Sequence, residues 1–209
     1  MNIFYKMFIA EAGSGIRYKD LPPGFAEKYA NILPKGLLEF WKDEGWCSYA
    51  DGQIWTINPE DYSWLADDWL KAYPELSSLV FYPFARSAFG EFYCLSPNSG
   101  KILTIACPRG VLLANRNLKN NRRGTCEEAA QTFFAVSKKK DFDLFTSSNT
   151  PMFPAAFERL GPLGPNEVYG FTPLLTLGGD WEVSNLEKVR MDVHIDQIRV
   201  SMDPALRLF

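Results

Sequence analysis

Five of the chain's six tryptophans lie between Trp41 and Trp69, and aromatic residues make up 15% of the sequence. Rings of this size need a large apolar interior, so we expect aromatic side chains to dominate the core. The 209 residues are enough for one sizeable core or two small ones. With 46% hydrophobic and 22% charged residues, the composition is that of an ordinary soluble globular protein.

The same tryptophan-rich stretch is strongly acidic. Residues 35–75 contain nine acids and three bases, a local charge of −6 against −3 for the whole chain. Aromatic side chains beside uncompensated carboxylates are typical of a docking surface for a basic protein, because Trp and Tyr anchor interfaces and the field steers association. In the alternative interpretation, the rings belong to the core and the acids form a solvated face.

Residues 101–140 carry the opposite charge, with nine bases and two acids giving +7. Nucleic-acid contact is one explanation of this basic segment. However, its bases lie in an Asn-rich loop and at a helix end, with little aromatic interleaving, and the whole chain is acidic. We therefore expect no direct nucleic-acid binding.

The residues that usually carry catalysis or bind metals are sparse. The four cysteines form no CxxC pair, which predicts free thiols in a reducing cytoplasm. His194 is the only histidine, and the neighbouring Asp192 and Asp196 are poorly placed to pair with it on a helix, so we expect a packed structural side chain. Gly178-Gly179 fits a tight turn rather than a phosphate loop. We expect no cofactor, no metal and no enzymatic activity.

Apolar runs such as residues 174–177 are far too short to span a bilayer. The N-terminus has no long apolar region and no small-residue cleavage signature. We therefore expect neither membrane insertion nor export, and a cytoplasmic location.

Local signals predict the elements of the first half. Pro34 suits the first turn of a helix and Gly45 its left-handed end, which predicts a helix over residues 34–45. Asp51-Gly52 tolerates positive φ and predicts a hairpin over residues 47–57. Asn58-Pro59 starts a further helix, with Tyr62, Leu65 and Trp69 on one face. A shorter helix is expected over residues 24–31.

Strand signals follow at residues 79–85, 89–95 and 101–106, with residues 111–114 as an added edge strand. Thr125 and Glu128 form a capping box that opens a helix burying Ala129, Ala130 and Phe133, with Phe134 or Val136.

A composition shift at residues 138–141 marks the predicted boundary between a region 1–140 and a region 141–209. Beyond it we expect a helix over residues 151–160 and a strand over 168–171. Ser184 and Glu187 form a second capping box, which predicts a helix from there to Ser201, although the alternation over residues 189–195 also fits a strand. The predicted fold is α+β, with a central antiparallel or mixed sheet flanked by helices and a smaller C-terminal α/β subregion packed on it.

Several segments carry a resemblance to known families. Residues 33–46 (LPKGLLEFWKDEGW), 51–55 (DGQIW) and 58–62 (NPEDY) resemble the GAD-related domain, and Ala88-Phe89-Gly90-Glu91 is similar to its small-aromatic-Gly-acid element. Leu160-Gly161, residues 167–171 (EVYGF) and 174–179 (LLTLGG) resemble the C-terminal domain of immunity proteins paired with type VI secretion DNase effectors. The matches span most of residues 20–200, with region 1–140 as the GAD-like domain and region 141–209 as the immunity-protein domain.

The resemblance implies a cytoplasmic α+β immunity protein, similar in role to the SMI1/KNR4 type, that binds and blocks a cognate toxin effector, a nuclease. A non-catalytic regulatory or scaffolding module of the same fold is the alternative. Because a nuclease is basic where it holds DNA, an acidic surface can compete for that site. The predicted partner-binding residues are Asp43, Glu44, Glu60, Asp61, Trp64, Asp67 and Asp68. The basic loop 115–123 is an equally open alternative, facing an acidic part of the toxin.

Overall fold

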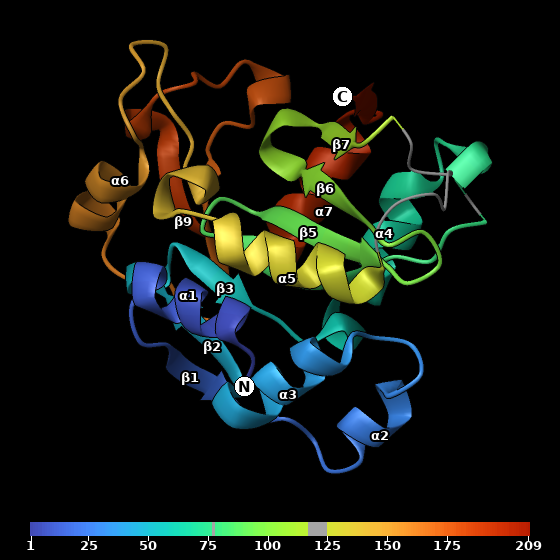
Figure 1. Ribbon diagram of the computed structural model, residues 1–209. Helices are drawn as coiled ribbons and strands as arrows, with labels where there is room; N and C mark the ends of the chain where they lie inside the picture. The colour runs from blue at the N-terminus through green and yellow to red at the C-terminus, as the bar shows by residue number, and fades with distance from the viewer. Residues whose placement is uncertain (77, 117–124) are drawn as a thin grey trace.

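A computed structural model of the chain describes residues 1–76, 78–116 and 125–209 (Figure 1). Seven α-helices are described: α1 (Ile3–Ala12), α2 (Phe25–Tyr29), α3 (Lys35–Glu44), α4 (Ser63–Leu70), α5 (Cys126–Val136), α6 (Phe153–Leu160) and α7 (Met191–Ser201). The described strands are β1 (Ile16–Lys19), β2 (Trp46–Tyr49), β3 (Ile54–Thr56), β4 (Tyr82–Ser87), β5 (Glu91–Ser96), β6 (Lys101–Ala106), β7 (Val111–Ala114), β8 (Glu167–Phe171), β9 (Leu186–Arg190) and β10 (Ala205–Leu208).

The large sheet has eight strands in the order β1-β2-β3-β4-β5-β6-β7-β10. Neighbouring strands are antiparallel from β1 to β7, whereas β10 runs parallel to β7. The sheet is therefore mixed, and the predicted α+β fold is confirmed. Strands β8 and β9 form a separate antiparallel pair in the C-terminal part of the chain.

Helices cover both faces of the large sheet, so the molecule has two aromatic cores (Figure 1). Successive residues of β5 point to opposite faces: Phe92 and Cys94 join one core, and Tyr93 and Leu95 the other. Helices α1, α2, α3 and α5 bury their apolar faces in the core that holds Tyr93, and α4, α6 and α7 bury theirs in the core that holds Phe92. The expectation that rings dominate the core is confirmed.

Elements with strong local signals form where they were predicted. Gly45 ends α3 with φ of +74°, a conformation that favours glycine. Strands β2 and β3 form the predicted hairpin, with Asp51 at φ of +57° and Gly52 at +91°. The Thr125–Glu128 capping box opens α5 as expected, but Val136 is exposed and Phe134 is the buried residue.

The Asn58 cap is confirmed, since its side chain accepts a hydrogen bond from the backbone N–H of Glu60 at 3.1 Å. The first turn after it is a 3-10 helix, Pro59–Tyr62, and α4 begins only at Ser63. Both segments keep the predicted face toward the core, where Leu65 and Trp69 are buried.

The prediction of a helix starting at Ser184 is wrong. Leu186–Arg190 is strand β9, and α7 begins at Met191. The reason is tertiary pairing: four of the five residues of β8 are buried, and its backbone groups pair with β9 from Glu167↔Arg190 to Phe171↔Leu186. That requirement outweighs a four-residue capping pattern.

The predicted strand at residues 111–114 is confirmed as β7, but its predicted place at the edge of the sheet is wrong. Strand β7 pairs with β6 on one side and with β10 on the other, so the edge belongs to β10. Strand β10 comes from the last residues of the chain, about 90 residues beyond β7, and such long-range pairing leaves no local pattern in the sequence.

The C-terminal part is tied to the large sheet by hydrogen bonds as well as by β10. The backbone N–H of Tyr169 in β8 donates to the Ala88 carbonyl at 2.9 Å. The buried Arg86 of β4 donates to the Pro165 carbonyl at 2.9 Å. Its guanidinium carbon lies over Trp55, 4.4 Å from the centroid of the ring. The two parts therefore share contacts through the core, and the division at residue 140 stays a prediction.

Candidate functional site

The tryptophan-rich stretch separates into four buried rings and one exposed ring. Trp41, Trp46, Trp55 and Trp69 are each 3% exposed or less, which confirms that these rings form core. Trp64 is 39% exposed and lies on α4. It is therefore the ring of this stretch that can contact a partner.

The seven residues predicted to bind a partner come from two segments of the chain. Asp43 and Glu44 end α3, which packs against one face of the sheet, whereas α4 packs against the other. Their backbone carbonyls accept hydrogen bonds from Arg17, and the Asp43 carboxylate pairs with the N-terminal amine at 3.2 Å. The other five residues lie on the 3-10 turn and helix α4: Glu60, Asp61, Trp64, Asp67 and Asp68. Their role in binding stays a prediction.

Three of the acids near α4 are paired with bases that are distant in sequence: Glu60 with Lys28, Asp61 with Lys19, and Asp68 with Arg199. The hydrogen bond from Lys28 lowers the pKa of the Glu60 carboxyl below its usual value. Asp67 is exposed and makes no ion pair with any residue that the structure describes. Within this group, Asp67 thus offers the least compensated charge.

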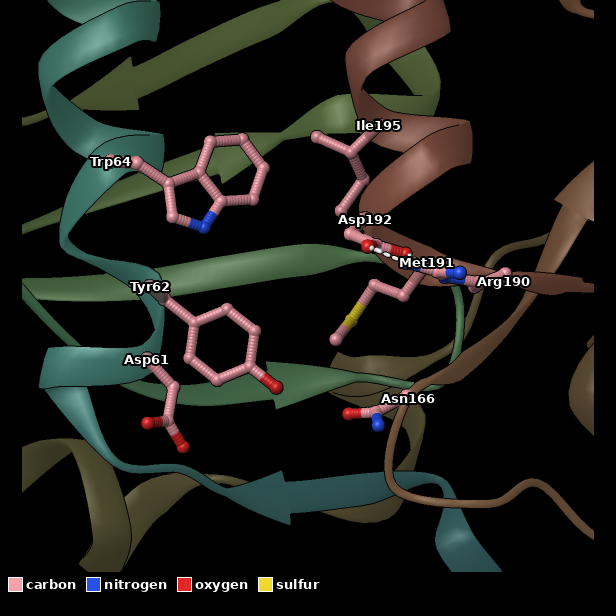
Figure 2. A pocket seen from close by; sticks show the side chains of 8 residues that line it. All are labelled: Asp61, Tyr62, Trp64, Asn166, Arg190, Met191, Asp192 and Ile195. Atoms are coloured by element: carbon pink, nitrogen blue, oxygen red, sulfur yellow. Dashed lines mark hydrogen bonds and ion pairs between the residues drawn. The ribbon is translucent and has the colours of Figure 1, made fainter.

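A pocket of about 340 Å³ lies between α4 and α7 (Figure 2). Asp61, Tyr62 and Trp64 line it from the 3-10 turn and α4, on the left of the view. Asn166, Arg190, Met191, Asp192 and Ile195 line it from the C-terminal part. Both parts of the chain therefore contribute to one concave surface, with aromatic and thioether walls and a polar rim. That combination is common in protein interfaces.

The rim of this pocket is held by a bidentate ion pair. Arg190 donates to the two carboxylate oxygens of Asp192, from Nε at 2.8 Å and from Nη2 at 2.6 Å. These bonds lower the pKa of Asp192 and raise that of Arg190. Burial raises the pKa of the Tyr62 hydroxyl, which therefore stays protonated and uncharged at neutral pH. The pocket therefore presents an uncharged tyrosine hydroxyl beside an arginine–aspartate pair.

Helices α4 and α7, which frame the pocket, are fastened together. Arg199 of α7 lies 3.6 Å from the Asp68 carboxylate, and it also donates to the Asp68 carbonyl at 3.4 Å. The Tyr73 hydroxyl donates to the Pro204 carbonyl at 2.8 Å and accepts from the backbone N–H of Leu206. These bonds fix the distance across the pocket, so its shape is preformed.

Sequence reasoning missed the C-terminal half of the pocket: Asn166, Arg190, Met191, Asp192 and Ile195. Asn166 follows a Gly/Pro loop and Arg190 ends a strand, so no motif or spacing marks either of them. Only the packing of α7 beside α4 brings these residues to Trp64. Asp192 was noted as a neighbour of His194 but binds Arg190 instead.

His194 is 7% exposed in α7, and burial lowers its pKa, so the expectation of a packed histidine is confirmed. The four cysteines are free thiols, three of them buried and Cys126 half-buried. Among the described residues, no group of three His, Cys, Asp or Glu side chains could hold a metal ion. Within the same residues, no helix is long and apolar enough to cross a membrane.

Family models match both parts of the chain. The family model of the GAD-like domain matches residues 3–109, which is more than half of the chain. The model of the type VI secretion immunity protein Tdi1, C-terminal, matches residues 127–199. None of the curated proteins matches the sequence.

The crystal structure of Atu4351 from Agrobacterium tumefaciens has a similar fold, with a TM-score of 0.81. The superposition covers 94% of this chain and 87% of that chain at 18% sequence identity. The chain belongs to the GAD-like domain family, and the match of its C-terminal part supports a type VI secretion immunity protein.

Proposed function

We propose that this chain neutralises a cognate type VI secretion toxin, a DNase, by binding it directly in the cytoplasm and without catalysis. The match of residues 127–199 to the Tdi1 C-terminal model is the observation that carries the proposal. The acidic character of the chain is compatible with it, because a DNA-binding surface is basic and an acidic inhibitor can compete for it.

The proposed docking surface consists of Trp64, Asp67 and the pocket between α4 and α7. An exposed tryptophan beside a preformed pocket is typical of a binding hot spot, since aromatic anchors bury much area at a low entropic cost. Asp67 adds a charge that no described base compensates, which favours a basic partner and faster association. The acids that are already paired, such as Asp61 and Asp68, contribute less.

Co-purification with the toxin encoded beside its gene tests the function. The chain and the toxin are expressed together, and the purified mixture is assayed for DNA degradation. A stable complex with the nuclease silenced is the expected result. Failure to form a complex, with DNA still degraded, would refute direct neutralisation and favour the regulatory or scaffolding alternative.

A charge reversal at Asp67 tests the surface. Asp67→Lys should slow association with the toxin several-fold at low salt, with a smaller effect at high salt, because salt screens steering. Glu11→Lys on α1 is the matched control: it is an exposed helical acid on the opposite face of the sheet, and it changes the net charge equally. Equal association rates for the two variants would exclude Asp67 from the docking surface.

The alternative docking segment, the basic loop 115–123, lies outside the described residues from position 117 onward. A variant that reverses the charges of Asp61, Asp67 and Asp68 together is a less specific test of the surface. Asp61 forms an ion pair with Lys19, and Asp68 forms one with Arg199. Loss of those ties would disturb the fold as well as the surface.

A further inference from the structure

A second pocket, of about 500 Å³, lies on the other side of α7 from the Trp64 pocket. The segment 171–177 forms one wall, and α7 forms the other through His194, Asp196 and Val200. Two apolar side chains at its mouth are unusually open to solvent: Leu177 is 69% exposed and Val200 is 81% exposed. Apolar residues gathered at a concave site are typical of an interaction surface.

The walls of this pocket are held in place by hydrogen bonds. The Thr172 backbone N–H donates to the Asn185 carbonyl at 2.8 Å, and the Asn185 side chain donates to the Pro173 carbonyl at 3.1 Å. The hydroxyls of Thr176 and Ser201 lie 2.7 Å apart and join the segment to the end of α7. A pocket with such fixed walls loses little conformational entropy when it is filled.

Asp196 is the acidic residue that lines this pocket. It makes no ion pair with any residue in the described part of the chain. The other titratable side chain of the lining, His194, is buried, and its lowered pKa leaves it neutral at neutral pH. The pocket therefore combines apolar walls with one uncompensated negative charge.

We propose that this pocket is a second anchor site for the toxin, taking a bulky apolar side chain that is followed or preceded by a lysine or arginine. The inference rests on the proposed function, because it names the toxin as the partner. The pocket volume has room for a large apolar side chain together with the residue next to it, and the Asp196 carboxylate complements a base at that neighbouring position. A second copy of this chain fits less well, because a twofold interface brings the same patch of both copies together, and the lining of this patch holds Asp196 but no lysine or arginine.

Site-directed variants with a matched control test this anchor. Val200→Asp places a charge in the apolar mouth, and Val136→Asp makes the same change at another exposed helical valine, 63% exposed, on α5 over the opposite face of the sheet. Both positions are open to solvent, so both variants should fold, which circular dichroism checks. The dissociation constant for the inactivated toxin encoded beside the gene is measured by calorimetry.

We expect Val200→Asp to weaken toxin binding by about tenfold or more, and Val136→Asp to bind with unchanged affinity. Asp196→Asn should weaken binding less and reduce its salt dependence. If the wild-type chain binds the toxin and Val200→Asp binds it with the same affinity, the second anchor alone is overturned. A wild-type chain that fails to bind would overturn the proposed function, and the anchor with it.

His194 allows a test without the toxin. As the only histidine of the sequence, it gives a single set of ring-proton signals from within the pocket. Millimolar N-acetyl-Phe-Lys-amide should shift these signals more than N-acetyl-Phe-Glu-amide does, and the difference should disappear in Asp196→Asn. Equal shifts from the two peptides would contradict the preference for a base.

Discussion

Replacement of Trp64 by alanine isolates the aromatic anchor of the proposed docking surface. The ring lines the pocket between α4 and α7 (Figure 2). It is 39% exposed, whereas its neighbour Leu65 is fully buried. Because about 150 Å² of the ring is already buried in the fold, its loss should lower the free energy of unfolding by up to about 4 kcal/mol, so circular dichroism must first show that the variant folds.

The effect on binding follows from the area that remains to be buried. A tryptophan can bury up to about 250 Å², so a ring that is 39% exposed still offers about 100 Å². At about 25 cal/mol per Å², full burial of that area is worth about 2.4 kcal/mol. This corresponds to a rise in the dissociation constant of up to about 60-fold.

Calorimetry with the inactivated toxin measures this change, with Phe4→Ala as the control. Phe4 is 36% exposed on α1, over the opposite face of the sheet, so it matches Trp64 in exposure but not in place. We expect a large loss of affinity for the toxin in Trp64→Ala and none in Phe4→Ala. Dissociation constants within twofold of the wild type for Trp64→Ala, or equal losses for both variants, would refute it.

Two further changes test how α7 and the sheet are supported. Gly170→Ala should lower the free energy of unfolding by about 1–3 kcal/mol, because its new methyl group would lie 2.5 Å from the His194 ring; thermal unfolding should show a melting temperature lower by about 3–10 °C. Arg109→Met leaves the buried Glu91 without its counter-ion and should cost about 2–3 kcal/mol at pH 7, less than a fully buried pair because Arg109 is 43% exposed. Burial already raises the pKa of Glu91, and losing Arg109 raises it further. The deficit should therefore grow as pH rises through the folded-state pKa of Glu91, which lies above its usual value, and vanish at lower pH, where the carboxyl is protonated in both proteins; denaturant titrations at several pH values measure it.

Sequence reasoning succeeded where the determinants are local. Pro34 and Gly45 bound α3, and Asp51-Gly52 turns the hairpin, because each needs only the conformational preference of one or two residues. The capping box at Thr125 opened α5 for the same reason. The capping pattern at Ser184 did not predict the structure, because the backbone of β8 pairs with residues 186–190 as a strand. No residue near Ser184 indicates that pairing.

The candidate site was harder to predict than the fold, because charge and exposure depend on distant residues. In the stretch 35–75, the formal charge is −6 from the sequence. Four positive groups from outside it pair with its acids: the N-terminal amine, Lys19, Lys28 and Arg199. They reduce the local charge from −6 to −2, so a count along the chain overstates the field that a partner meets.

The same pairing decides which residues can still recognise a partner. An acid that already holds a lysine gains little from a second cation, since the new contact must replace the old one and its hydration. The proposed recognition therefore rests on two acids without a described ion-pair partner, Asp67 and Asp196, and on the exposed ring of Trp64. These three lie along α4 and α7, two helices that the chain order separates by more than 120 residues and that Arg199 fastens together. A toxin that bridges both helices would hold the two matched parts of the chain at once, so substitutions in either part should weaken the same complex.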